Sequence, residues 1–195
     1  MGKMTLEDGN ALILVGLQCD AFPGGSIAIA DAPAIVPIAN RYLTAWSNLG
    51  LPIVLSRCWH PADHCSFHTH GGAWPAHAIA DSPGAAFAPD LFIPPTSIII
   101  STGNIASDDA SSAFADTELD SQLRRRGTTQ VFIGGIATEH CVLNTVRDAI
   151  EHDYATVVLR DASRAANVRP DDGTRAEDTM AELGAQVLAL EMLGL

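Results

Sequence analysis

QVFIGGIATEHCVLNTVRDA, residues 130–149, joins an apolar run to a helical pattern through a pair of glycines. The continuously apolar start is typical of a strand that is covered on both faces. Gly134 and Gly135 permit a tight turn that brings backbone close to a ligand. Cys141 follows at the start of the helix, where backbone N–H groups and the helix dipole favour a thiolate. The stretch therefore predicts a strand–turn–helix unit whose cysteine is either a nucleophile or, equally, a small buried apolar residue.

Strands and helices are expected to alternate along the rest of the chain. Five further apolar runs predict strands, at residues 11–17, 52–56, 97–101, 155–159 and 186–190. Helical patterns cover residues 32–49, 116–126, 140–152 and 172–183. This alternation requires crossover connections, so we expect a parallel sheet with helices on both faces. We assign residues 1–195 to one domain, and expect the long irregular segment 59–95 to be a functional loop.

The charge balance limits the partners that this chain can have. Its 11 Lys and Arg residues face 23 Asp and Glu residues, which gives a formal net charge of −12. Nucleic acids and anionic membranes need a basic surface, so neither is an expected partner. No apolar run is long enough to span a membrane, and residues 1–10 lack a signal-peptide core. We therefore expect a cytoplasmic protein with four free cysteines and with self-association left open.

Three motifs carry a resemblance to a known family. They are VGLQCDAFPGGSIAI at residues 15–29, WHPADHCSF at 59–67 followed by WPAH at 74–77, and GGIATEHCVLNTVRDA at 134–149. Together they resemble the nicotinamidase/isochorismatase-like cysteine hydrolases, and most closely the nicotinamidase branch, over about residues 11–190. The resemblance implies a three-layer α/β fold of isochorismatase type, with a central, mostly parallel sheet flanked by helices. It also implies hydrolysis of a small, nicotinamide-like carboxamide.

The resemblance assigns roles to particular residues. Cys141 matches the nucleophile, which attacks the amide carbonyl, forms a thioester and releases ammonia. Ile136-Ala137 resembles an often cis peptide whose N–H helps to form the oxyanion hole. Trp74 matches an aromatic residue that packs on the substrate ring, and Phe22 and Ile136 are further expected substrate contacts.

The chain departs from the family pattern at catalytic positions. Gly16 stands where the family has its general-base aspartate, and Thr102 stands where it has a lysine. General acid–base help is worth ~10²–10⁴-fold in rate, so another group has to supply it. Asp20 matches a separate, structural aspartate. His140 is expected to point elsewhere, because adjacent helical residues diverge by about 100°.

The His- and Cys-rich segment RCWHPADHCSFHTHGGAWPAHAI, residues 57–79, could serve proton transfer or metal binding. His64, His68 and His70 could reach the nucleophile from this loop. The resemblance places metal-binding histidines at His60 and His77, whereas Cys58 replaces a metal-binding aspartate. Thiolate and imidazole suit zinc or iron(II), and Cys58 and His60 can converge from one side of a strand end.

His64 is a possible fourth ligand, because it matches a further histidine of some relatives. The alternative is that the metal site has been lost. Three functions remain open on these grounds: a cysteine hydrolase of a small amide, a redirected metal-centred reaction, and a non-catalytic binding protein. Restoring Gly16→Asp and Thr102→Lys would separate a decayed site from a rebuilt one.

Overall fold

The computed structural model describes residues 4–194, so residues 1–3 and 195 of the expected domain lie outside it. Its centre is a six-stranded sheet in the order β3-β2-β1-β4-β5-β6, within which every described pair is parallel. The strands are β1 (Asn10–Val15), β2 (Ile53–Cys58), β3 (Ile98–Thr102), β4 (Gln130–Ile136), β5 (Ala155–Arg164) and β6 (Gln186–Leu188). The expected α/β fold with a parallel sheet is confirmed.

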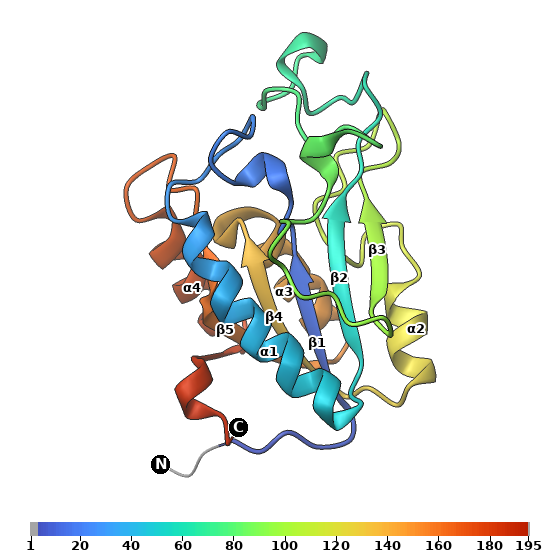
Figure 1. Ribbon diagram of the computed structural model, residues 1–195, viewed down its shortest axis with the longest axis vertical. Coiled ribbons are helices and arrows are strands. Elements are labelled where there is room, and N and C mark those ends of the chain that lie inside the picture. Colours follow the sequence, from blue (N-terminus) through green and yellow to red (C-terminus); the bar gives the residue numbers. More distant parts are fainter. Residues whose placement is uncertain (1–3, 195) are drawn as a thin grey trace.

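Helices cover the two faces of the sheet and separate two apolar cores. They are α1 (Ile35–Leu49), α2 (Leu119–Arg125), α3 (Leu143–Glu151) and α4 (Asp172–Glu182). In Figure 1, α1 crosses in front of the sheet and α3 lies behind it. Trp46 of α1 packs edge-on against Phe132 of β4, with 5.0 Å between ring centroids. The residues of β1 alternate between the cores, because successive strand side chains point to opposite faces.

The predicted element boundaries are close to the observed ones. Each strand begins within one residue of its prediction, and the largest difference is in β5, which continues to Arg164. The helix predicted from residue 140 is divided, because a π-helical turn (Thr138–Val142) precedes α3. No helix among residues 4–194 is both long enough and apolar enough to cross a bilayer.

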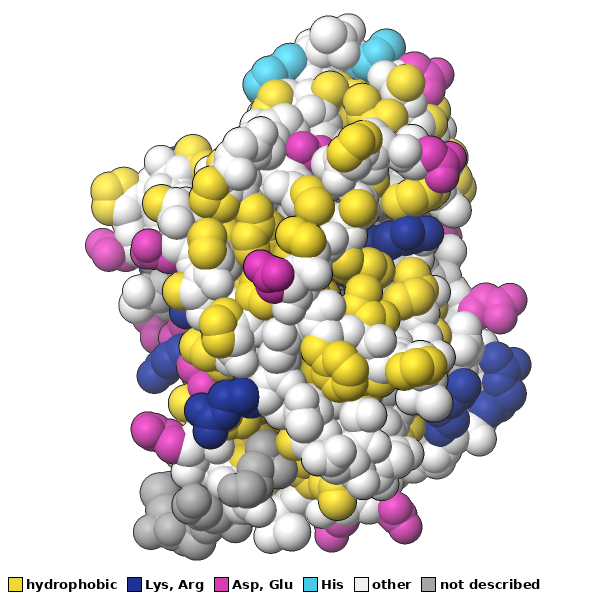
Figure 2. Space-filling model, in the orientation of Figure 1, with side chains coloured by type: hydrophobic (Ala, Val, Ile, Leu, Met, Phe, Trp, Pro, Cys, Tyr) yellow, Lys and Arg dark blue, Asp and Glu magenta, His cyan; other side chains and the backbone are white. Residues whose placement is uncertain are grey.

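The strand order reverses between β1 and β4. In open parallel sheets, ligands bind beyond the carboxyl ends of the strands at such a switch point. The segment between β2 and β3 lies above these strand ends (Figure 1). Figure 2 shows histidine side chains gathered at this same end of the molecule. The fold therefore brings the His- and Cys-rich segment and the turn after β4 to one place.

Candidate active site

A cavity of about 330 Å³ lies beyond the carboxyl ends of β1, β2 and β4. Five segments contribute to its wall: the turns after β1, β2 and β4, the loop after β3, and the loop after β5 at Ala166. Of the predicted site residues, Cys141, Ile136, Ala137 and Trp74 line it, as do Cys58, His60 and His77. The topology thus brings together groups that lie more than 80 residues apart in the sequence.

Cys141 lies in the π-helical turn between β4 and α3, and its side chain is half-buried. The peptide bond between Ile136 and Ala137 is cis, as the resemblance implies. π-Helical turns inside helices are frequent at functional sites. The cysteine therefore lines a cavity and is not enclosed in apolar packing.

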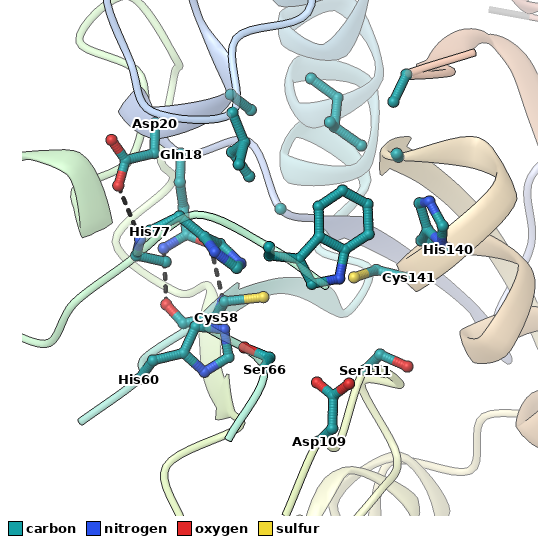
Figure 3. Close-up of a pocket in the computed structure, with 18 of the residues that line it drawn as sticks. Gln18, Asp20, Cys58, His60, Ser66, His77, Asp109, Ser111, His140 and Cys141 are labelled. Atoms are coloured by element: carbon teal, nitrogen blue, oxygen red, sulfur yellow. Dashed lines mark hydrogen bonds between the residues drawn. The ribbon is translucent and has the colours of Figure 1, made fainter. Parts of the chain in front are cut away.

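Cys58 and Cys141 form a thiol pair across the end of β1, and Figure 3 shows the two sulfur atoms pointing toward each other. The hydrogen bond from Cys141 lowers the pKa of Cys58 well below its usual value, against the effect of burial and with help from His60 and His77. The same hydrogen bond, together with burial and the negative charges of Cys58 and Asp109, raises the pKa of Cys141 well above its usual value. The two thiols therefore titrate as a pair, which favours a thiolate at Cys58 over one at Cys141.

Gly16 lies directly after β1, between the strand ends that carry the two cysteines. Its φ is +67°, and a Cβ at this position would collide with the carbonyl oxygen of Ile136. Its N–H donates to the carbonyl of Ser56 at 2.9 Å, which holds the backbone in place. An aspartate cannot enter this backbone without displacing β1 or β4. The aspartate that the resemblance implies at this position would therefore need a different local backbone.

Gln18 fixes the position of Cys58 through its side-chain amide. The amide oxygen accepts the N–H of Cys58 at 2.8 Å, and the amide nitrogen donates to the Cys58 carbonyl at 2.7 Å. A second bond from the nitrogen reaches the carbonyl of Ala85 at 2.9 Å. Because Gln18 is buried, these bonds clamp the end of β2 to the end of β1. Sequence reasoning missed this residue, although an amide side chain directly after an apolar run is a recognisable signal.

Asp20 holds the loops around the cavity, as its match to a structural aspartate predicts. Its two carboxylate oxygens accept N–H bonds from Ser26 at 3.2 Å and from Ala78 at 2.7 Å. The second bond is drawn in Figure 3. Ala78 follows the WPAH motif, so Asp20 positions the segment that carries Trp74 and His77.

One wall of the cavity is aromatic. Trp74 meets the ring of His140 edge-on, with 4.9 Å between ring centroids, and both residues line the cavity. The prediction that His140 points elsewhere is wrong, because the π-helical turn changes the direction of its side chain.

Phe22 lies outside the lining and packs against the core on the α1 side. Ala21 takes the cavity position, since the chain makes a short 3₁₀ turn at Cys19–Ala21.

The expected imidazole ligands are oriented by backbone carbonyls. Nδ1 of His60 bonds to the Gly103 carbonyl at 2.8 Å, and Nδ1 of His77 bonds to the Pro75 carbonyl at 2.9 Å. Such bonds leave Nε2 available and are usual for histidines that bind metals. His64 differs, because Nδ1 contacts Ser66 at 2.7 Å and Nε2 contacts the Asp108 carbonyl at 2.9 Å. His64 is therefore not available as a fourth ligand.

The three-residue metal site is not assembled in this structure. Within residues 4–194, no three His, Cys, Asp or Glu side chains are arranged to hold one ion. The imidazoles of His60 and His77 lie close together, with 5.0 Å between their ring centroids, but the sulfur of Cys58 faces Cys141. The prediction of zinc or iron(II) at Cys58, His60 and His77 stays a prediction, and no chemical step is derived through a metal.

Thr102 and the two remaining loop histidines lie outside the cavity that Cys141 lines. Thr102 is buried and its hydroxyl donates to the Arg57 carbonyl at 3.3 Å. His68 and His70 lie on an exposed 3₁₀ turn. The carboxylate of Asp109, on the loop after β3, does point into the cavity (Figure 3). Sequence reasoning missed Asp109, although acidic residues follow the third strand in NIASDDASS, residues 104–112.

Known proteins are similar to this chain in sequence and in architecture. A family model for the isochorismatase domain matches residues 10–192. The nicotinamidase of Escherichia coli is 32% identical over 92% of this chain and 94% of its own length. The nicotinamidase/pyrazinamidase of Mycobacterium tuberculosis is 33% identical over 89% of this chain and 91% of its own.

The similarity extends to solved structures. The pyrazinamidase of Pyrococcus horikoshii, solved in complex with zinc, superposes with a TM-score of 0.89 and 36% identity. The match covers 93% of this chain and 99% of that protein. The similarity in sequence and in architecture therefore extends over nearly the whole chain. The chain belongs to the nicotinamidase/isochorismatase family of hydrolases.

Proposed function

We propose that the chain hydrolyses a small, uncharged carboxamide of the nicotinamide type through a thioester on Cys141. The observation that carries this proposal is the position of the Cys141 side chain, in a cavity at the start of a helix and beside the backbone of Ala137. Covalent catalysis by cysteine needs a sulfur that can reach the carbonyl carbon and donors for the oxygen.

The proposed chemistry follows from these two features. The sulfur attacks the amide carbon, and the developing oxyanion is stabilised by the backbone N–H groups of Ala137 and Cys141. Collapse of this intermediate releases ammonia and leaves a thioester, which water hydrolyses to the carboxylic acid. Preorganised backbone donors of this kind contribute about 2.7–4 kcal/mol each to the stability of the transition state.

The lining of the cavity favours a neutral, flat substrate. Trp74 and His140 form an aromatic wall, and Ile27 and Ile29 add apolar surface. No Lys or Arg is among the residues that line the cavity, all of which lie in the described part of the chain. A substrate with a carboxylate would find no Lys or Arg partner there and would lose its hydration. The relatives named as nicotinamidases support the same substrate class.

We propose divalent-metal binding separately from this mechanism. Nε2 of His60 and of His77 would hold the ion, and Cys58 would complete the set only if its sulfur left Cys141. A bound ion would supply a Lewis acid near the substrate. Zinc titration with alkylation of thiols checks this proposal: zinc should protect Cys58 and make Cys141 easier to alkylate. Equal alkylation of both residues with and without zinc would contradict it.

Ammonia release from nicotinamide tests the proposed hydrolysis. The wild-type protein should release ammonia and nicotinate, whereas Cys141→Ala should release none. Cys65→Ser is a matched control, because Cys65 is half-buried like Cys141 but does not line the cavity. It should keep the wild-type rate. A protein that hydrolyses no neutral aromatic carboxamide, or that does so without Cys141, would contradict the proposal.

A further inference from the structure

The loop after β3 carries a carboxylate into the cavity that holds Cys141. Asp109, Ala110 and Ser111 of this loop all line the cavity. Figure 3 shows the carboxylate of Asp109 directed toward the space below the two sulfur atoms. The side chain is exposed, so water can reach it from the mouth of the cavity. Sequence similarity assigned no role to this position.

The Asp109 loop is fastened to the helix that follows Cys141. The side-chain amide of Asn144 donates to the Ser111 hydroxyl at 2.7 Å. Thr145 accepts the N–H of Ala113 at 3.0 Å and donates to the carbonyl of Cys141 at 2.6 Å. The hydroxyl group of Thr145 therefore links the loop to the residue that carries the nucleophile. The loop that carries Asp109 and the turn that carries Cys141 are therefore joined by one network of hydrogen bonds.

The other side of the loop is fastened to the His- and Cys-rich segment. The carbonyl of Gly103 accepts from His60 at 2.8 Å, and the carbonyl of Ala106 accepts the N–H of Cys65 at 2.7 Å. His64 contacts the Asp108 carbonyl, one residue before Asp109. Contacts on both sides restrict the motion of the loop and keep the carboxylate at the cavity. A group that is held in place loses less entropy when it acts on a bound substrate.

Among the described residues, two carboxylates line the cavity, and one of them is already engaged. Both oxygens of Asp20 accept backbone N–H groups, so that side chain holds loops in position. Within residues 4–194, the Asp109 carboxylate makes no hydrogen bond or ion pair with another side chain or with the backbone. The carboxylate therefore points into the cavity with its oxygens free to exchange a proton.

We infer that Asp109 is the proton acceptor and donor for Cys141, in place of the aspartate that is absent at Gly16. This role rests on the proposed amide hydrolysis and adds a residue to it. The carboxylate takes the proton of the Cys141 thiol while the sulfur–carbon bond forms and the carbonyl electron pair moves to oxygen. It then gives this proton to the nitrogen as the carbon–nitrogen bond breaks and ammonia leaves.

The second half of the cycle uses the same carboxylate in reverse. Asp109 accepts a proton from the water that attacks the thioester carbon. The carbon–sulfur bond then breaks, the sulfur takes the proton back, and the carboxylic acid leaves. The sum of the steps is amide plus water to acid plus ammonia, with Cys141 and Asp109 regenerated. The exposure of Asp109 places it where this water enters.

Two reactions of the full chain test the inference. The first is ammonia release from nicotinamide, which needs both a base for the thiol and an acid for the nitrogen. The second is the acylation burst with p-nitrophenyl acetate, which needs a base but has a leaving group that requires no proton. Asp109→Asn should lower the first rate by ~10²–10⁴-fold and the second by a smaller factor. Formate should restore part of both rates in Asp109→Ala.

Asp108→Asn is the matched control. Asp108 is the preceding residue of the same loop, but its carboxyl group contacts Asp116 and does not line the cavity. This variant should stay within about twofold of wild type in both reactions, since it removes no group that aids proton transfer. Cys141→Ala should abolish the burst, which shows that the ester reports on this thiol.

The outcomes separate the inference from the proposed function. A slower burst in Asp109→Asn without any amide hydrolysis by wild type would refute the amidase function and keep the role of Asp109. Wild-type rates for Asp109→Asn in both reactions would overturn the inference and leave the amidase function intact. A loss in Cys58→Ser together with none in Asp109→Asn would also overturn it and would identify Cys58 as the proton acceptor.

Discussion

Introducing an aspartate at Gly16 should fail to supply a base, because the backbone there cannot hold a side chain. Gly16 has φ +67°, and an added Cβ would collide with the Ile136 carbonyl oxygen. A non-glycine residue in the left-handed region costs roughly 1–2 kcal/mol. Forcing a group into a packed site adds about 1–3 kcal/mol. Gly16→Ala should therefore lower the free energy of unfolding by about 2–5 kcal/mol.

Gly50 provides a control that separates the two contributions. Its φ is +68°, nearly the same as at Gly16, and an added Cβ would meet nothing within 4 Å. Gly50→Ala should therefore lose only the conformational part, roughly 1–2 kcal/mol. Since 1 kcal/mol shifts the Tm of a chain of this size by about 2–4 °C, the two variants should differ by several degrees.

Urea and thermal unfolding of Gly16→Ala and Gly50→Ala test this prediction. An activity assay of Gly16→Asp completes the test. We expect Gly16→Asp to be less stable than Gly16→Ala and to gain no hydrolysis of nicotinamide, alone or with Thr102→Lys. Equal losses of stability in Gly16→Ala and Gly50→Ala would refute the collision with Ile136. A large gain of activity in Gly16→Asp would show that the site has merely lost a side chain.

Three further perturbations follow from the hydrogen bonds of the site and of α2. Asp20→Ala should lower the free energy of unfolding by roughly 1–3 kcal/mol in urea titrations, because it leaves two backbone N–H groups without an acceptor. Cys58→Ala should move the pH dependence of iodoacetamide alkylation at Cys141 to lower pH, because Cys58 is the main cause of the raised Cys141 pKa; an unchanged profile would contradict the thiol pair. Burial acts to raise the pKa of Asp120, but the hydrogen bonds from Arg124 and Tyr154 outweigh it and lower the pKa. Above about pH 4, Asp120→Asn should therefore lower the free energy of unfolding by less than about 1 kcal/mol. Once the pH falls below the folded pKa of Asp120, this loss should be absent.

Much of the fold could be predicted from the sequence, because strands and helices of this kind have local signals. Apolar runs between turn residues marked all of the strands described here, and the helical patterns marked the four helices. Parallel topology followed from the alternation of the two. The turn at residues 134–142 also placed Cys141 at the start of a helix, and the motifs around it indicated the family.

Only the tertiary structure decided how the site is completed. The contact between Cys58 and Cys141 joins the end of β2 to the turn after β4, across the intervening β1, and no local pattern encodes it. The same holds for Asp109, which reaches the cavity because hydrogen bonds to α3 and to the histidine segment fix its loop. A glycine in the sequence shows that a side chain is absent; whether one could fit depends on which backbone atoms the folded chain brings against it.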